Sequence, residues 1–438
     1  MSVVNSRNRM HVDFAVVGAG PAGAHIAGAL ARTGFKVALV EQYGRGRDKP
    51  CGGLIDLALW DMLGSARNGL PAWPIRGTAV FSLGTNHITF RSEKTRSYAV
   101  FRSELDTLLS DRAEQCGANL LENTKVRGIK YNDSGVRLIN GNGTAITSDM
   151  VVGADGTYSI VARSANLRPE VGHSELIFCL VSEFPLGQSR LEREIEDINT
   201  IEVYMLGGLG YGWVIPKGDY VNIGCGQAYD HLQNSNELWR KFLRTLHRHS
   251  RFVYTKIPRP KGYFYRSLKG PVVRTYADRT VLLGDAAGFA NNLSGEGIWP
   301  AIQSADIALP VLERAFTNGD YSTSALELYE KNWKRRFQSE FIRKQKLLQL
   351  ITQISIIRKG FLGRLIGVQA WSEGETFDRA LQFIKDHKEL YYMLNEVYQH
   401  RNAAVVVLPK LKKKLPSFAL DYFGTSLYRR LRGEQPNY

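Results

Sequence analysis

The sequence is poor in cysteine and has no long apolar run. Four of its 438 residues are cysteines. Cys51, Cys116, Cys179 and Cys225 are far apart, without a C-x-x-C pair or a histidine at ligand spacing. We therefore predict no metal or iron–sulfur site, and we expect reduced thiols in a cytoplasmic protein. Because the sequence lacks a stretch of about 18 apolar residues and an N-terminal secretion signal, we expect neither a membrane-spanning helix nor secretion.

Basic residues are concentrated at one end of the chain. Lysine and arginine outnumber aspartate and glutamate by 57 to 42, and residues 331–438 alone hold 21 basic and 9 acidic residues. This distribution favours an anionic partner for the C-terminal region, such as lipid headgroups or a phosphorylated substrate. Since the rest of the chain has little net charge, we do not expect nucleic acid as a partner.

What is abundant is glycine, with 42 residues, beside 44% hydrophobic and 23% charged residues. Such a composition is typical of a folded chain of two or three domains.

Residues 13–41 read as strand, glycine turn, helix, strand and acid. Gly18 permits a tight turn, Gly20 lets the backbone approach a pyrophosphate, and Gly23 lets helix and strand pack closely. The predicted phosphate-binding residues are Gly18, Gly20, Pro21, Ala22 and Gly23, at the start of a helix expected to run to about Arg32.

The segment ends at an acidic residue. Glu41 lies 18 residues beyond Gly23, where its carboxylate can accept both ribose hydroxyls of an adenosine. The same carboxylate would repel a 2′-phosphate, so FAD or NAD is favoured over NADP at this site. A glycine-rich turn of an ordinary α/β protein is the alternative, but the flanking strands and the acid together favour dinucleotide binding.

Two later segments repeat the pattern of an apolar strand that ends at an aspartate. In residues 149–159 the aspartate is Asp155, which we expect to brace a turn. In residues 280–288 it is Asp285, which can face the ribityl hydroxyls of a flavin. The predicted flavin-binding residues of this second segment and of the helix that follows, expected to reach about Leu312, are Gly284, Asp285, Gly295, Gly297 and Ile298.

With these three motifs in order over residues 13–310, the chain resembles the flavoprotein hydroxylase group. The resemblance implies FAD as cofactor and an α/β fold, in which a Rossmann-type FAD-binding domain is interrupted by an antiparallel β substrate domain. It also implies that Arg102, early in a helix, contacts the FAD pyrophosphate and that Val126 meets the adenine through its backbone. A solvated helix start for Arg102 and plain strand core for Val126 are the alternatives.

Two further motifs narrow the resemblance to the geranylgeranyl reductase family. The chain has Pro50-Cys51-Gly52-Gly53, and residues 211–217 read YGWVIPK where that family has Y-x-W-x-F-P-K. Ile215 and Asn292 depart from the family pattern, which has phenylalanine and proline there. The resemblance places Gly52 and Gly53 beside the flavin. It implies reduction of isolated prenyl double bonds by reduced FAD, on geranylgeranyl diphosphate, a prenylated lipid, a chlorophyll precursor or a quinone.

Three residues are predicted to carry this chemistry. An isolated alkene is not polarised, so hydride addition needs a proton at the other carbon and a dry, apolar site. Tyr211 and Trp213 alternate along one strand face, where they could line an isoprenoid tunnel or simply pack a half-buried sheet. Cys51 lies between a proline and two glycines. It could donate a proton at the flavin or tune the flavin, or it could be a small buried hydrophobic residue.

The domain boundaries follow from these motifs and from alternating strands at residues 78–81, 87–90, 177–181, 201–204 and 220–223. The FAD-binding domain is predicted in three parts, the substrate domain in two, and the last region is helical and basic. The three parts of the FAD-binding domain are residues 1–75, 99–174 and 276–320. The two parts of the substrate domain are residues 76–98 and 175–275, and the C-terminal region is residues 321–438.

The C-terminal region combines an apolar stripe, residues 347–361, with basic flanks. It could lie on a membrane surface or pack onto the FAD-binding domain. We expect a cytoplasmic protein with a peripheral contact at the inner face of the membrane, made through this region, and an external electron donor, NADPH or a reduced carrier. The competing functions are an oxygen-using monooxygenase or halogenase acting on a hydrophobic small molecule, and a non-catalytic flavin-bound lipid-binding protein.

Overall fold

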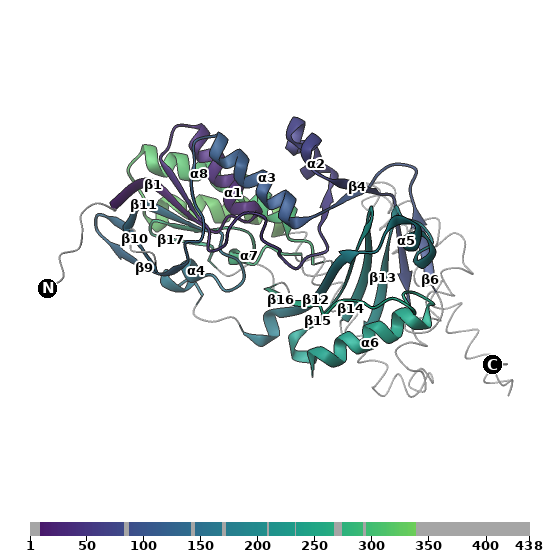
Figure 1. The fold of residues 1–438 in the computed structure, drawn as a ribbon. Coiled ribbons are helices and arrows are strands. Elements are labelled where there is room, and N and C mark those ends of the chain that lie inside the picture. Colours follow the sequence, from purple (N-terminus) through teal and green to yellow (C-terminus); the bar gives the residue numbers. More distant parts are fainter. Residues whose placement is uncertain are drawn as a thin grey trace, which may run out of the picture.

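The computed structural model describes residues 9–82, 87–141, 145–168, 172–207, 210–232, 234–266, 274–291 and 295–338. These parts of the chain form two sheet-based units, joined by a small third sheet (Figure 1). Within them, no helix is both long and apolar enough to cross a membrane.

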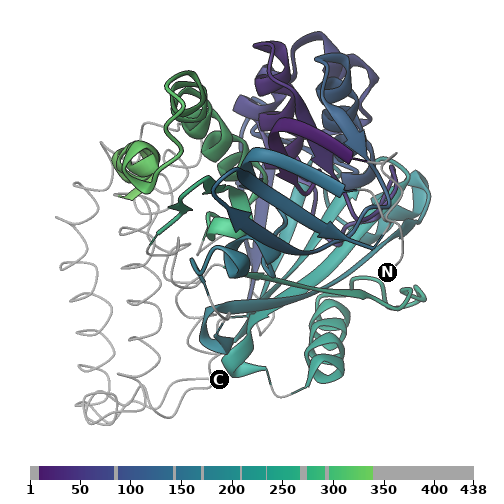
Figure 2. The same cartoon turned by 90° about the vertical axis from the view of Figure 1, so that its left-hand side faces the viewer.

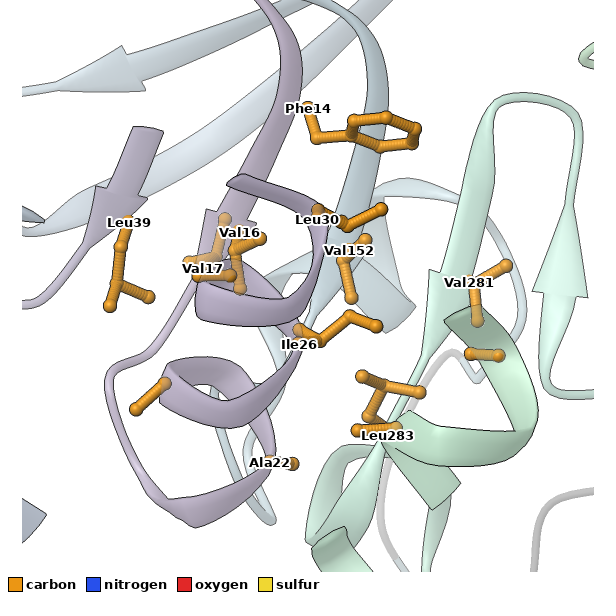
Figure 3. Close-up of a cluster of buried hydrophobic side chains, with 14 of the residues drawn as sticks. Phe14, Val16, Val17, Ala22, Ile26, Leu30, Leu39, Val152, Val281 and Leu283 are labelled. Atoms are coloured by element: carbon orange, nitrogen blue, oxygen red, sulfur yellow. The ribbon is translucent and has the colours of Figure 1, made fainter. Parts of the chain in front are cut away.

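The first unit is an α/β layer whose central strand precedes the predicted glycine turn. Its core forms where apolar side chains of the first helix meet those of the strands (Figure 3). Phe14 and Val16 of the central strand are fully buried, as expected for a parallel sheet covered by helices. The elements are β1 (Arg9–Val17), α1 (Pro21–Arg32), β2 (Val37–Val40), α3 (Arg102–Gln115), β8 (Asn119–Leu121), β9 (Val126–Asn132), β10 (Gly135–Asn140), β11 (Ala145–Gly153), α4 (Ile160–Ser164), β17 (Tyr276–Ala277), β18 (Thr280–Leu282), α7 (Gly284–Ala287) and α8 (Ile298–Thr317).

The strands of this unit run in the order β17-β18-β11-β1-β2-β8, and β10 and β9 extend from β11 as an antiparallel hairpin. The pairs of β1 with β11 and with β2 are parallel. The first helix ends at Arg32, as predicted. Helix α8 was predicted to end near Leu312 but continues to Thr317, because Val311, Leu312 and Ala315 are buried and packing outweighs the proline at 310.

The second unit contains a seven-stranded sheet with the order β16-β12-β15-β14-β13-β5-β6. All predicted strands are present. The prediction of an antiparallel sheet was wrong at one pair, because β5 and β13 are parallel. A long stretch of chain separates these two strands, so no hairpin fixes their relative direction. The elements are β5 (Gly77–Phe81), β6 (His87–Arg91), η2 (His173–Glu175), β12 (Leu176–Pro185), α5 (Gln188–Glu194), β13 (Thr200–Gly207), β14 (Gly210–Lys217), β15 (Tyr220–Ala228), η3 (Tyr229–His231), α6 (Ser235–Arg248) and β16 (Lys261–Arg266).

The two faces of the second sheet have different neighbours. One face packs on α6, which lies on the side away from α1 in both views (Figures 1 and 2). A Cβ on Gly212 would be 2.3 Å from the Phe242 ring, so this glycine permits the close approach of α6. Because side chains alternate along a strand, Trp213, Ile215 and Lys217 point to the opposite face. That face meets the small third sheet, which packs on Ile215.

The third sheet connects the two units, with the order β3-β7-β4. Its middle strand leads directly into α3, and its first strand follows the Pro50–Gly53 segment. It therefore holds this segment and the start of α3 against β14. The elements are β3 (Leu54–Asp56), α2 (Leu57–Leu63), η1 (Gly64–Gly69), β4 (Ala72–Ile75) and β7 (Ser97–Val100).

The beginning of the basic C-terminal region is described as far as residue 338. Residues 323–338 are helical, and Trp333 and Phe337 pack against the ring of Phe289 at centroid distances of 5.4 and 5.7 Å. Trp333 also donates from Nε1 to Thr275 Oγ1 at 2.9 Å. This part thus packs onto the first unit. The basic residues from 343 on, the apolar stripe at 347–361 and the proposed membrane contact lie outside the described residues.

Candidate functional site

The turn between β1 and α1 can be built only with glycine at two positions. Gly18 has φ +97°, and its Cβ would lie 2.4 Å from the carbonyl oxygen of Ala154. A Cβ on Gly23 would lie 1.8 Å from the carbonyl oxygen of Gly18. These contacts are with backbone atoms, which cannot move aside. The turn is therefore held tightly between α1 and the end of β11.

Gly20 is different, because the space beside it is open. Among the described residues, only the guanidinium of Arg47 comes within 4 Å of its Cβ position, at 3.6 Å. Gly20 is the N-cap of α1, and Pro21 is the first helical residue. The first N–H groups of a helix have no partner within the helix and attract anions. An open, positively polarised face of this kind fits the pyrophosphate of a dinucleotide.

Glu41 stands beside this face with its carboxylate fixed in place. The side chain is buried, and it accepts from the backbone N–H of Ala19 at 2.8 Å and from that of Tyr43 at 3.1 Å. A cleft extends from it between β2 and α3. The residues that line the cleft are Ala19, Glu41, Gly44, Arg45, Gly46, Arg47, Asp106, Thr107, Ser110, Leu120 and Glu122.

Arg102 is the first residue of α3, and its side chain is buried. Its guanidinium donates twice to Asp106, from Nε at 3.0 Å and from a terminal nitrogen at 2.9 Å, and Arg47 pairs with the same carboxylate at 3.2 Å. Burial opposes the charged form, but Asp106 and the Cys51 sulfur more than compensate, so the pKa of Arg102 is raised. Arg102 therefore keeps its charge between the cleft and the Cys51 thiol.

The second aspartate motif lies near the aromatic residues of the second sheet. A Cβ on Gly297 would be 3.3 Å from Asp285 Oδ1, which puts this carboxylate at the start of α8. Gly295 has φ +70°, and its Cβ would meet the hydroxyls of Tyr265 and Tyr211 at 2.6 and 3.1 Å. The loop before α8 thus lies directly against the tyrosines that reach over from β16 and β14.

The Cys51 loop approaches the same strand, β14. The Gly53 N–H points to Cys51 Sγ at 3.4 Å. A Cβ on Gly52 would be 2.9 Å from Ile215 Cδ1 and 3.7 Å from Trp213 Nε1. Gly53 has φ +69° and is equally confined. The thiol and the predicted aromatic residues therefore face one region between the two units.

This region has a neutral, aromatic wall. The rings of Tyr211 and Trp213 lie 5.8 Å apart, and the hydroxyls of Tyr211 and Tyr265 form a hydrogen bond. Burial raises the pKa of both tyrosines and of the Cys179 thiol. All three groups are therefore protonated near neutral pH. Such a wall suits an apolar ligand that carries no charge at the point of contact.

Taken together, the cradle at Gly20, the oriented acid Glu41 and the second aspartate Asp285 fit FAD. The described residues contain no group of three or more histidine, cysteine, aspartate and glutamate side chains that could hold a metal ion. Asp155 accepts from Ser159 Oγ at 2.6 Å and from the Ile160 N–H at 2.7 Å, so it stabilises the turn before α4.

Comparison with known proteins agrees with this fit. Residues 11–340 match the family model described as FAD binding domain. The chain belongs to the FAD-binding domain family. It is an FAD-dependent oxidoreductase, and its cofactor is FAD. The digeranylgeranylglycerophospholipid reductase of Methanocaldococcus jannaschii is 28% identical over 357 residues, which cover 78% of this chain and 87% of that protein.

Solved structures share the fold. A geranylgeranyl bacteriochlorophyll reductase-like protein of Thermoplasma acidophilum superposes with a TM-score of 0.75 at 21% identity, over 95% of this chain and all of the other. A variant of the halogenase PltM in complex with FAD gives a TM-score of 0.59 at 17% identity, over 73% of each chain. The resemblance to geranylgeranyl reductases that the sequence predicted is confirmed, and the oxidoreductase is distantly related to them.

The structure brings most of the predicted site residues together. Ala19 of the pyrophosphate turn and Glu41 line the cleft together with Asp106, the ion-pair partner of Arg102. The Cys51 loop lies against Trp213, whose ring is next to that of Tyr211, and Tyr211 faces Gly295. Val126 begins β9 with a buried side chain, and its role at the adenine stays a prediction. The roles of all these residues toward FAD and substrate are predictions. The residues that sequence reasoning missed are Arg47, Asp106, Glu183, Asn222 and Tyr265, which no local motif marks.

The position of the Trp213 ring depends on a glycine in the neighbouring strand. A Cβ on Gly224 would lie 2.2 Å from Trp213 Cζ2 and 2.9 Å from the carbonyl oxygen of Leu180. We expect Gly224→Ala to push the indole away from its place and to lower kcat/KM for a prenyl substrate about tenfold or more, with FAD content unchanged. Steady-state kinetics with an absorption spectrum of the bound flavin measure both effects.

A matched control for this change lies on the edge strand β16. Gly262 and Tyr265 are three residues apart on β16 and therefore point to opposite faces of the sheet. In Gly262→Ala the new methyl group would be 3.1 Å from the Phe178 ring, on the face away from the aromatic wall. We expect near-normal turnover for this variant. Equal turnover of the two variants would show that the placement of Trp213 is unimportant.

Proposed function

We propose that this oxidoreductase saturates isolated carbon–carbon double bonds in the prenyl chain of a lipid or diphosphate. The substrate class comprises geranylgeranyl diphosphate, prenylated lipids, chlorophyll precursors and polyprenyl quinones. The observation that carries the proposal is the convergence of the Cys51 loop with the neutral aromatic wall of Tyr211, Trp213 and Tyr265. The names of the relatives, among them digeranylgeranylglycerophospholipid reductases, point to the same class.

The chemistry requires a hydride and a proton to add to the two carbons of one double bond. Reduced FAD, when bound, supplies the hydride. The chain must then exclude water, hold the prenyl segment flat, and place one acid near the second carbon. Aromatic faces bind the apolar chain and stabilise positive character that develops at the tertiary carbon.

Two kinds of group are available to hold the proton. The Cys51 thiol lies on the Pro50–Gly53 loop, where the Gly53 N–H points to its sulfur. The hydroxyls of Tyr211 and Tyr265 are protonated because burial raises the pKa of both. We assign the proton to Cys51, with the tyrosines as wall and hydrogen-bond donors.

The electrons come from outside the chain, from NADPH or a reduced carrier protein.

We further propose that the basic C-terminal region contacts the membrane surface, which would shorten the path of a water-insoluble substrate into the site. Exposing a prenyl chain to water costs about 0.8 kcal/mol for each CH₂ group, so uptake from a bilayer is favourable.

The deciding experiment is an anaerobic single turnover. We expect chemically reduced holoenzyme, incubated with geranylgeranyl diphosphate or a digeranylgeranyl phospholipid, to yield a product heavier by two hydrogen atoms for each bond saturated. Mass spectrometry of the extracted lipid measures this. A product that forms only with oxygen, and that carries added oxygen or halogen, would instead show monooxygenase or halogenase chemistry.

A further inference from the structure

A polar network with a buried centre lies directly behind the Cys51 loop. At its centre is Asn222 of β15, whose side chain is fully buried. Its Nδ2 donates to the backbone oxygen of Cys51 and to Glu183 Oε1, each at 2.9 Å. Its Oδ1 accepts from Trp213 Nε1 at 2.8 Å. One amide therefore joins the loop that carries the thiol to the indole of the aromatic wall.

Lys217 extends the network to the far end of the loop. It has no solvent exposure, pairs with Glu183, and donates to the backbone oxygen of Val100 at 2.8 Å. The Val100 N–H in turn donates to the backbone oxygen of Gly53 at 2.8 Å. Since Arg102 follows Val100 by two residues, the network fixes the loop and the start of α3 with respect to the second sheet.

The glycines of the loop have no side chains with which to hold it. The Cβ positions of Gly52 and Gly53 are occupied by Ile215, by the Val100 oxygen and by Lys217 Nζ, at 2.9, 2.2 and 2.7 Å. The loop therefore fits closely against β14. Hydrogen bonds to the loop backbone set the position of the loop. Among these bonds, the one from Asn222 to the Cys51 backbone oxygen is nearest to the thiol.

A polar network of this kind specifies geometry. A buried ion pair with its amide partner can often be replaced by apolar side chains of similar volume without loss of stability, whereas its geometry is specific. Asn222 lies on β15 between two neighbouring strands. It is paired with Glu183 of β12 on one side and with Ile215 of β14 on the other. An apolar trio at these positions would satisfy the packing but would not orient the loop.

We propose that Asn222 is a positioning residue that sets the Cys51 thiol and the Trp213 ring in a fixed relation to each other. This rests on the proposed function, in which the thiol and the wall act on the same double bond. Asn222 acts through its two neighbours and has no role in the chemistry itself. Lys217 and Glu183 hold its amide in the orientation that serves both.

The test uses full-length holoenzyme with Asn222→Leu, which removes both donors and the acceptor, and Asn222→Asp. The aspartate keeps the acceptor for Trp213, and the one proton it shares with the adjacent Glu183 carboxylate leaves none for the Cys51 oxygen. We expect FAD content to stay normal and kcat to fall between about tenfold and a hundredfold, as is usual when reacting groups are displaced by up to an ångström. KM should change less than kcat, because the aromatic wall remains.

A second readout is independent of the prenyl substrate. Alkylation of Cys51 by iodoacetamide, followed by peptide mass spectrometry, should be about tenfold faster in both variants, since the loss of one hydrogen bond frees the loop by about this factor. Cys116, a partly buried thiol at the end of α3, is the internal reference and should react at an unchanged rate.

The matched control is Ser182→Ala. Ser182 precedes Glu183 on β12, is buried, and donates to the backbone oxygen of Pro258 at 3.1 Å on the opposite face of the sheet. This variant loses a buried hydrogen bond without touching the loop, so Cys51 should react at the wild-type rate.

The results separate the two hypotheses. Faster alkylation of Cys51 in both Asn222 variants, with Ser182→Ala unchanged, supports the positioning role even if wild-type enzyme proves not to reduce prenyl chains. Alkylation at the wild-type rate in folded, flavin-containing Asn222→Leu or Asn222→Asp would overturn it. Should Asn222→Leu fail to fold, the isosteric Asn222→Asp decides in the same way.

Discussion

Replacing Gly20 by aspartate is expected to give a folded but colourless protein. Aspartate is a favoured helix N-cap, and the space beside Gly20 is open, so α1 should form normally. The new carboxylate, however, would stand where the pyrophosphate binds. Like charges about 4 Å apart repel by about 4 kcal/mol at the effective dielectric of a partly buried site, which corresponds to a loss of affinity of about a thousandfold.

The measurement is the flavin absorbance of the purified protein, before and after soaking with FAD, together with its far-UV circular dichroism. Gly69→Asp is the control, because no atom lies within 4 Å of its Cβ position and it is remote from the turn in sequence. It should retain FAD. A yellow Gly20→Asp protein with wild-type affinity would refute the placement of the pyrophosphate at α1.

Arg102→Met is expected to have the second large effect, and to affect stability as well as cofactor binding. The substitution leaves the buried Asp106 carboxylate with Arg47 as its described ion-pair partner. Removing one member of a buried pair lowers the free energy of unfolding by about 3–5 kcal/mol. Because Arg47 still pairs with Asp106, we expect a loss of about 3 kcal/mol. The affinity for FAD should also fall, because a fixed positive charge beside the cleft is lost.

Chemical denaturation followed by circular dichroism gives the free energy of unfolding for this comparison. The control is Arg67→Met, the same substitution at an exposed pair in which Arg67 lies 3.4 Å from Asp61. Exposed pairs contribute about 0–1 kcal/mol. Equal destabilisation by the two variants would mean that the Arg102–Asp106 pair contributes no more than a surface contact does.

The strand–turn–helix–strand segment at the start of the chain could be predicted from the sequence because its parts are adjacent in the chain. Gly18, Gly20, Gly23 and Glu41 lie within this single unit, and Gly18 and Gly23 are each needed for a local geometric reason. The strands of the second sheet were predicted for a similar reason, since alternating apolar residues between turns are a local pattern. Trp213 and Tyr211 could be placed on one face by counting residues.

The contacts between distant segments could not be predicted in this way. The parallel pairing of β5 with β13 has no local signature, and the prediction of an antiparallel sheet was wrong there. The bond between Asn222 and Cys51 joins residues 171 positions apart. An asparagine in the middle of a strand also looks unfavourable by propensity, and only its three hydrogen-bond partners explain it.

The sequence by itself determined that this chain has a dinucleotide-binding motif at its first turn and that it resembles flavin-dependent reductases, because both follow from short motifs with local geometry. Only the tertiary structure decided which side chains share a site. Arg47 meets Asp106, Tyr265 meets Tyr211, and Lys217 reaches Val100 because three sheets pack together. The physical reason is that the covalent chain constrains neighbours in sequence, whereas the orientation of a buried thiol or indole depends on hydrogen bonds and packing from segments that fold onto it.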